Sequence, residues 1–326
     1  MCGRLACTLE PDTLCRACEY KSANGKRRTP SWTESVLDLK PSANLGPRDV
    51  LPCIVGGSHL MSKNERILCT MMWGMIPPWH KGHYKKHTLA THNARLENLK
   101  TSKLFAPPFG KGKRCIVVCE GYYEWKAGAT KKDKKQPYYI YATQEKGVRT
   151  DDPSTWKDEY SEEHGWKGIK LLRMAGIFNT FTTAEGELIY SCSVITTNSN
   201  NVLSWLHERA PVFLHTEEDE RDWLNADLST SEVMEKLSQL KLPSGTLSWH
   251  TVSTLVNNVQ NKSDDCRKQI KVAKEEKKSG PTGFMASWLK KGSADSSKRK
   301  SITTEDTDKN DNSDSKDKPA KIPKRE

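Results

Sequence analysis

Seven short runs of apolar residues, rich in β-branched and aromatic types, recur between residues 50 and 254. They occupy residues 50–55, 66–76, 114–119, 137–143, 171–181, 189–197 and 246–254. Side chains of this kind fit the pleated, half-buried surface of a sheet, so each run predicts a β-strand. These strands outnumber every other predicted element, and they constrain the fold more than any other feature of the sequence.

Five segments have the pattern of a helix: residues 10–20, 94–105, 200–208, 217–225 and 231–240. The last three follow Asn, Thr or Ser residues that can cap a helix N-terminus. Helices and strands do not alternate regularly, which favours an α+β fold over a doubly wound parallel sheet. We therefore expect one strand-rich α+β domain with peripheral helices over residues 2–266.

The composition changes after residue 266. Residues 267–326 contain 17 Lys or Arg and 10 Asp or Glu, but few aromatic or branched apolar residues. Such a segment buries too little apolar surface to offset the entropy cost of ordering it. We therefore predict a disordered basic tail over residues 267–326, which carries much of the net charge of +11.

Charge within residues 2–266 is segregated. Basic clusters at residues 81–86, 111–114 and 131–135 contrast with an acidic run over residues 151–163. They are either solvated loops or a surface that guides a polyanion to one face. No apolar stretch is long enough to span a membrane, and the first residues lack a signal peptide. We expect an intracellular protein whose ten cysteines are reduced thiols.

The chain opens with the sequence MCGRLAC. If Met1 is removed, Cys2 carries a thiol and a free α-amine on adjacent carbons, which are two nucleophiles in one small group. The alternative is that residue 2 belongs to an ordinary unstructured terminus. The other motifs of the chain decide between these two interpretations.

Metal binding has two candidate motifs. Cys15-x-x-Cys18 has ligand spacing but no second pair, and the two thiols fall on one face of a predicted helix, which favours buried cysteines. Four histidines lie close together at His80, His83, His87 and His92, but the lysines between them suit a loop facing phosphate better than a metal site. We predict neither a metal nor a cofactor.

Three further motifs place polar side chains in apolar surroundings. THNAR holds Asn93 and Arg95, CEGYYEW holds Glu120 and Glu124, and LSWLHERAPVFL holds His207 and Arg209. Each has a structural alternative: a helix cap, a strand-end carboxylate, or a histidine at a helix C-terminus. Together with Cys2 they supply a nucleophile, an amide, carboxylates, an imidazole and arginines, which is what covalent chemistry on a phosphodiester polymer needs.

Six motifs in one order resemble the SOS-response-associated peptidase (SRAP) family. They are MCGR at the terminus, WGMIPPW, THNAR, EGYYEW, LHERAPV and VSTLVNNVQNKSDDC. The resemblance implies covalent attachment to abasic sites in single-stranded DNA, which shields the lesion. By motif match it implies that Cys2 is the nucleophile and that its active-site partners are Asn93, Glu124 and His207.

The resemblance also implies DNA-binding residues. Arg4, Arg95 and Arg209 would contact phosphates around the lesion, and Trp79 stands where the family places an aromatic side chain against a base. Two positions depart from the family pattern. Leu89 replaces an aromatic wedge, which weakens stacking, and Ala210 replaces a methionine, which changes packing.

The chemistry follows from the functional groups. An abasic site contains a small fraction of open-chain aldehyde, with which the α-amine of Cys2 forms an imine. The thiol then adds to the imine carbon and closes a five-membered thiazolidine ring. Glu124 would hold the amine or shuttle protons, His207 would act as acid or base when the sugar ring opens, and Asn93 would orient residue 2.

Two other functions stay open at this point. One is a thiol autopeptidase that removes its own leader, although only Met1 precedes Cys2. The other is a non-covalent reader of modified cytosine, which requires a pocket for a flipped base.

The tail suggests a partner and a compartment. Residues 282–291 place Met285, Trp288 and Leu289 at the spacing of a motif that binds a replication sliding clamp, without its usual leading Gln. An amphipathic helix for another partner is the alternative. Basic clusters at residues 298–300 and 321–325 suit nuclear import, although basic tails also add nonspecific nucleic-acid affinity. We expect a monomer in the nucleus, at replication forks, with no membrane association.

Overall fold

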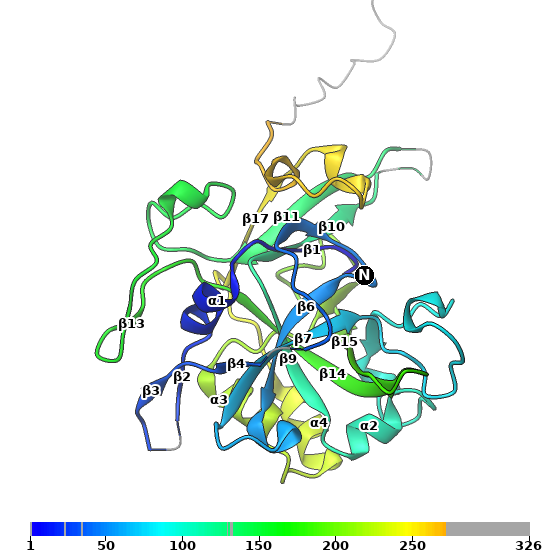
Figure 1. Cartoon of the computed structure of the whole chain (residues 1–326). Helices are drawn as coiled ribbons and strands as arrows, with labels where there is room; N and C mark the ends of the chain where they lie inside the picture. Colours follow the sequence, from blue (N-terminus) through cyan, green and yellow to red (C-terminus); the bar gives the residue numbers. More distant parts are fainter. Residues whose placement is uncertain (1, 23, 34, 129, 131–132, 272–326) are drawn as a thin grey trace, which may run out of the picture. The chain divides into compact units, whose positions relative to one another are not determined.

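Five strands form a closed ring at the centre of the fold (Figure 1). The computed structural model describes residues 2–22, 24–33, 35–128, 130 and 133–271. Antiparallel pairs join β15 to β14, β14 to β9, β9 to β6 and β6 to β7, and a parallel pair joins β7 back to β15. The bounds of these strands are β6 (Val50–Gly56), β7 (Arg66–Trp73), β9 (Arg114–Cys119), β14 (Leu172–Thr182) and β15 (Leu188–Asn198).

The ring explains why the apolar runs are nearly continuous rather than alternating. Every residue of β7 and β9 is buried, since one face of each strand points into the ring and the other is covered. Three short strands extend the ring: β4 (Ser31–Thr33) beside β7, and β8 (Asn93–Arg95) and β16 (Arg209–Pro211) on the far end of β15. All seven predicted strands are present.

A second, antiparallel sheet has the order β17-β11-β10-β1-β5. Its strands are β1 (Leu5–Cys7), β5 (Ser42–Leu45), β10 (Gly121–Lys126), β11 (Gln136–Ala142) and β17 (Leu247–Thr251). The chain passes from the ring into this sheet at Glu120, between β9 and β10. Figure 1 shows β1, β10, β11 and β17 side by side. Two small hairpins complete the strands: β2 (Tyr20–Lys21) with β3 (Arg27–Arg28), and β12 (Tyr160–Ser161) with β13 (Gly165–Trp166).

Helices lie at the periphery, as an α+β fold of this kind predicts. They are α1 (Pro11–Ala17), α2 (Ala106–Gly110), α3 (Glu217–Leu224) and α4 (Thr230–Gln239). Capping boxes begin α3 at Thr216 and α4 at Ser229. The Trp223 indole of α3 donates to the carbonyl of Cys115 at 2.8 Å, which fixes this helix on β9. No helix in the described ranges is long and apolar enough to cross a membrane.

Three of the five predicted helices are confirmed, at residues 10–20, 217–225 and 231–240. The helix predicted over 94–105 is wrong, because the start of this segment hydrogen-bonds to β15 as β8 and continues as the short 3₁₀ turn η3 (Leu96–Asn98). The helix predicted over 200–208 is also wrong. This segment forms turns and then returns to β15 as β16 at Arg209. In both places pairing with β15 overrides local helix propensity.

The last described residues are part of the fold rather than of a tail. Two 3₁₀ turns, η5 (Thr254–Asn257) and η6 (Asp264–Cys266), precede Arg267, whose side chain is completely buried. The amide of Ile270 then donates to the carbonyl of Thr251 at 2.9 Å. The boundary predicted after residue 266 therefore cuts contacts within the folded segment. The candidate clamp motif at residues 282–291 lies outside the described residues.

Candidate active site

Cys2 is held at the end of β1, beside β10. Leu5 pairs with Tyr122, and the amide of Tyr123 donates to the carbonyl of Arg4 at 3.0 Å, so the chain before β1 continues along β10 toward Glu124. The Cys2 side chain is completely buried. A residue so close to a chain terminus is seldom ordered in this way unless something holds it.

The amide side chain of Asn93 holds Cys2 from the other sheet. Its Nδ2 donates to the carbonyl oxygen of Cys2 at 2.6 Å. Asn93 begins β8, which runs parallel to β15 with Asn93 opposite Val194, so the amide is aimed by a paired strand. The buried Oδ1 of Asn93 has no hydrogen-bond donor among the described residues. The structure therefore brings Asn93 and Cys2 together. Among the described residues, the Oδ1 atom of Asn93 remains available to accept a hydrogen bond in this site.

Glu124 supplies a carboxyl group beside Cys2. Its side chain is buried, and burial together with the Glu124 carboxylate raises the pKa of the Cys2 thiol far above neutrality. The thiol therefore carries its proton at pH 7, with a carboxylate close enough to affect its titration. Tyr122, two residues earlier on the same face of β10, has its pKa raised by burial and then by Cys2 and Glu124. The motif EGYYEW contained Tyr122, and strand alternation was the signal that could have placed it beside Glu124.

His207 lies between β15 and β16 and is half-buried. Its Nδ1 accepts a hydrogen bond from the amide of Arg209 at 2.9 Å. A neutral imidazole that accepts at Nδ1 carries its proton at Nε2. His207 is thus presented with a defined donor nitrogen, which suits a residue that donates a hydrogen bond to an oxygen.

The predicted phosphate-binding arginines differ in their surroundings. Arg4 donates to the Asn44 side chain at 3.0 Å and to the carbonyls of Val256 and Asn257 at 2.6 and 3.1 Å. Arg209 is 9% exposed and makes an ion pair with Glu97 at 2.8 Å. It also donates to the side chain of Asn198 and to the carbonyl of Thr196. Both guanidinium groups are thus engaged inside the protein.

Arg95 is the arginine of this group that faces solvent. It stands opposite Thr196 on β15, one strand away from the segment that carries Arg209. Trp79 is 56% exposed and Leu89 is 49% exposed in the loop before β8. Trp79, Leu89 and Arg95 are therefore exposed, unlike Arg209, among the positions that the family resemblance linked to DNA.

Because Arg209 is buried and Arg95 is exposed, we expect their substitution by alanine to affect different properties, stability for Arg209 and DNA binding for Arg95. Arg209→Ala should destabilise the fold by about 1–3 kcal/mol, because buried acceptors such as the carbonyl of Thr196 lose their donor. Arg95→Ala should leave the urea midpoint unchanged and lower the salt-dependence slope of single-stranded DNA binding by about 0.7. Equal urea midpoints for Arg209→Ala and the unsubstituted protein would contradict a structural role for Arg209.

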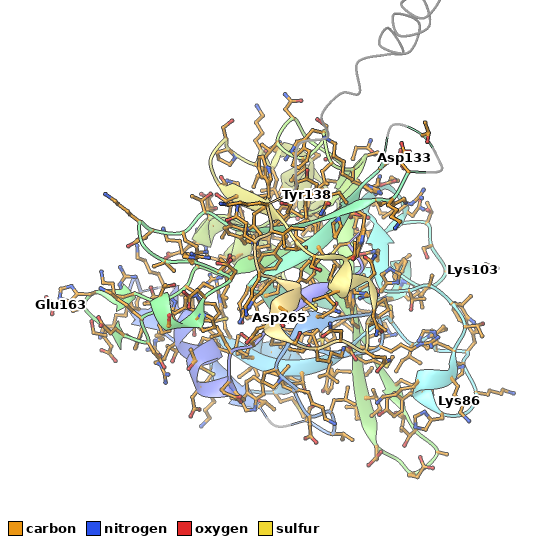
Figure 2. All side chains as sticks on the ribbon, turned by 90° about the horizontal axis from the view of Figure 1, so that it is seen from above. Lys86, Lys103, Asp133, Tyr138, Glu163 and Asp265 are labelled. Carbon is orange, nitrogen blue, oxygen red and sulfur yellow. The ribbon has the colours of Figure 1, made fainter. Side chains whose placement is uncertain are left out.

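The remaining candidate groups are structural or peripheral. Glu120 is completely buried, pairs with Arg267 and accepts from the amides of Thr8 and Leu9, so it fixes the fold rather than facing a substrate. The rings of His80 and His87 meet edge to face at 5.9 Å. No group of three potential ligands has metal-binding geometry within the described ranges. Figure 2 shows Lys86, of the basic cluster at residues 81–86, on the side of the molecule opposite Glu163, of the acidic run.

The geometry defines a fold of two joined sheets with a buried N-terminal cysteine at their junction, and comparison with known proteins gives this class a name. The family model described as SOS response associated peptidase (SRAP) matches residues 1–259. The chain belongs to this family.

Several named proteins are similar over most of their length. The abasic site processing protein HMCES of Xenopus tropicalis is 34% identical over 277 residues, which cover 83% of this chain and 78% of that protein. HMCES of Rattus norvegicus is 34% identical over 296 residues, covering 89% and 82%. The abasic site processing protein YoqW of Bacillus subtilis is 31% identical over 229 residues, covering 70% and 86%. A crystal structure of a protein from Bacteroides thetaiotaomicron has the same fold, with a TM-score of 0.57 at 22% identity, and covers 83% of this chain and all of that one.

Proposed function

We propose that this protein senses and processes abasic sites in single-stranded DNA by forming a covalent bond through Cys2. The observation that carries the proposal is the amide of Asn93 on the carbonyl of Cys2, which orders a residue that a terminus would otherwise leave loose. The names of the similar proteins, which include vertebrate and bacterial abasic site processing proteins, support the same substrate.

The reaction balances without an oxidant or a cofactor. Removal of Met1 frees the α-amine of Cys2, which attacks the aldehyde carbon of the open-chain sugar; water leaves and a C=N bond forms. The thiol sulfur then adds to the imine carbon while the thiol proton passes to the nitrogen. The product is a five-membered thiazolidine, and the net change is the loss of one water.

Because the Cys2 thiol is buried and protonated, transfer of its proton is the step that requires catalysis. Because burial and Glu124 keep the Cys2 thiol protonated, the sulfur needs a base when it attacks, and Glu124 is the nearby carboxylate. In this proposal Glu124 takes the thiol proton and returns it to the ring nitrogen. His207 stabilises the sugar oxygen by a hydrogen bond from its Nε2–H when the hemiacetal opens, and Asn93 keeps the amine pointed at the aldehyde.

A denaturing gel tests the function. Single-stranded DNA from which a uracil has been excised should give a slow-migrating protein–DNA band, whereas the same DNA reduced with borohydride, which has no aldehyde, should give none. Absence of the band with folded protein would contradict the proposal. Cleavage of an N-terminal leader without DNA would indicate the autopeptidase. Tight, band-free binding to DNA containing hydroxymethylcytosine would indicate a reader of modified cytosine.

We also propose a cellular setting for this activity. A monomer that shields lesions in single-stranded DNA would act in the nucleus at replication forks. Met285, Trp288 and Leu289 are then the candidate contacts with a sliding clamp. Substitution of Trp288 by Ala should abolish capture by the purified clamp while leaving crosslinking to abasic DNA intact.

A further inference from the structure

An aromatic cluster continues the active-site face of the second sheet. Side chains alternate along a strand, so Tyr122, Glu124 and Lys126 point to one side of β10. Glu124 stands directly opposite Tyr138 of β11, and cross-strand neighbours on one face have Cβ atoms about 5 Å apart. The face that begins beside Cys2 therefore runs outward through Tyr138 (labelled in Figure 2) to the edge strand β17.

Three aromatic rings follow one another along this face. The rings of Tyr138 and Trp205 meet edge to face with centroids 5.0 Å apart, and the rings of Trp205 and Trp249 lie 5.3 Å apart. The Trp205 indole donates to the carbonyl of Val202 at 3.0 Å, which fixes the ring. The ammonium of Lys126 lies 5.0 Å from the centre of the Trp205 ring. Aromatic rings with a lysine beside them thus extend from the catalytic carboxylate to the rim.

Trp249 is exposed although its neighbours on the same face are not. Leu247, two residues earlier on β17, is buried, whereas Trp249 is 39% exposed. The opposite face of the same strands is fully used, since His250 bonds to the carbonyl of Arg267 and packs on Tyr139 and Tyr141. Leaving a tryptophan ring in water costs free energy that packing of the strand would otherwise recover. This ring is available to an aromatic partner that arrives from solution.

The positive charge at this end of the sheet favours a negatively charged partner. Lys126, Lys134 and Lys135 are exposed where β10 turns into β11. Asp133 is exposed in the same turn, with one carboxylate oxygen accepting from the amide of Thr130. A protein surface that binds single-stranded nucleic acid combines aromatic rings, on which the bases stack, with positively charged groups that bind the phosphates.

We propose that Tyr138, Trp205 and Trp249, with Lys126, form a stacking platform for the bases of the DNA strand that flanks the lesion. This inference rests on the proposed function, because continuity with Cys2 and Glu124 identifies the occupant. Trp249 stacks with a base through its exposed ring, Trp205 supports Trp249 from beneath, and Lys126 contacts the phosphate backbone. Trp249 and Lys126 are thereby assigned as binding residues that none of the sequence motifs contained.

The test uses DNA that cannot react. A single-stranded oligonucleotide with a tetrahydrofuran in place of the abasic sugar has no aldehyde, so its binding is measured separately from crosslinking. A 2-aminopurine placed one to four nucleotides to either side of this sugar reports stacking by loss of fluorescence. We expect quenching on one side only. Trp249→Ala should remove the quenching and weaken binding about 5-fold to 100-fold, and Trp249→Phe should restore most of both.

Two further variants separate stacking from charge and from folding. Lys126→Ala should lower the salt-dependence slope by about 0.7, whereas Trp249→Ala should leave the slope unchanged. Leu255→Ala is the control, because Leu255 is 47% exposed in the segment that covers the opposite face. It should change neither binding nor quenching. Wild-type affinity and quenching for a folded Trp249→Ala protein would overturn the platform, whereas failure of the unsubstituted protein to crosslink aldehyde-bearing DNA would overturn the proposed function instead.

Discussion

A chain truncated after Lys271 is expected to unfold at the same urea concentration as the full chain, whereas one truncated after Cys266 should lose about 3–5 kcal/mol. The largest part of the difference arises from Arg267, whose guanidinium forms an ion pair with Glu120 while both side chains are completely buried, and the bonds between Ile270 and Thr251 add to it. Arg267 also bonds to Asp264 at 2.7 Å and lies 5.1 Å from the ring of Trp156. Its removal leaves the Glu120 carboxylate in the interior without a compensating charge.

Two controls make this prediction specific. Adding Glu120→Gln to the shorter chain should recover part of the lost stability, because no charge then remains buried. Burial raises the pKa of Glu120 even beside Arg267. The shorter chain should therefore regain stability as the pH falls and the carboxyl takes up a proton. In the full chain, Lys268→Ala removes only an exposed pair with Asp265 and should have no effect. Identical urea midpoints for the two truncated chains would contradict a structural role for Arg267.

Replacing Cys2 is expected to abolish the stable crosslink completely. Cys2→Ala keeps the α-amine, so an imine should still form and be trapped by borohydride, but no band should survive heating without reduction. Cys2→Ser should behave similarly, since an oxygen-containing ring reopens more readily than one with sulfur. An uncleaved N-terminal tag should remove even the borohydride-trapped product, because an amide nitrogen cannot form an imine.

A matched cysteine variant controls for general thiol chemistry. Cys15 is half-buried on α1, has no free amine, and lies outside the residues that surround Cys2. Cys15→Ala should crosslink at the unsubstituted rate. A tagged protein that retains Met1 and still forms a heat-stable band with abasic DNA would show that the thiazolidine mechanism is wrong.

The elements of the fold could be predicted where one local pattern decides the structure. Five of the seven apolar runs became strands of the ring, where burial on both faces suits a continuous apolar sequence, and the other two became β11 and β17 of the second sheet. The closure of the ring could not be predicted. It depends on a parallel pair between β7 and β15, which join Met72 to Ser191 across more than a hundred residues. No local pattern encodes a partner at that distance.

The sequence motifs name the residues of the candidate site, but they do not indicate the surroundings of each side chain. The motif THNAR identified Asn93 as a site residue while its flanking sequence indicated a helix, and the structure places it on a strand that points its amide at Cys2. The same motifs assigned Arg4 and Arg209 to phosphates, yet both guanidinium groups bond within the protein. The sequence does not indicate whether an arginine side chain bonds within the protein. Its acceptors can be backbone carbonyls, such as those of Val256 and Thr196, and every residue type has one.

The pairing of β8 with β15 has a consequence for the order of events during synthesis. Cys2, the proposed nucleophile, is synthesised early, but the strand that aims Asn93 at it has no partner until residues 188–198 have followed. Long-range parallel pairing is also slow to form. A nascent chain therefore displays Cys2 without the amide that positions it, and this amide is in place only after residue 198 has been synthesised and the ring has closed.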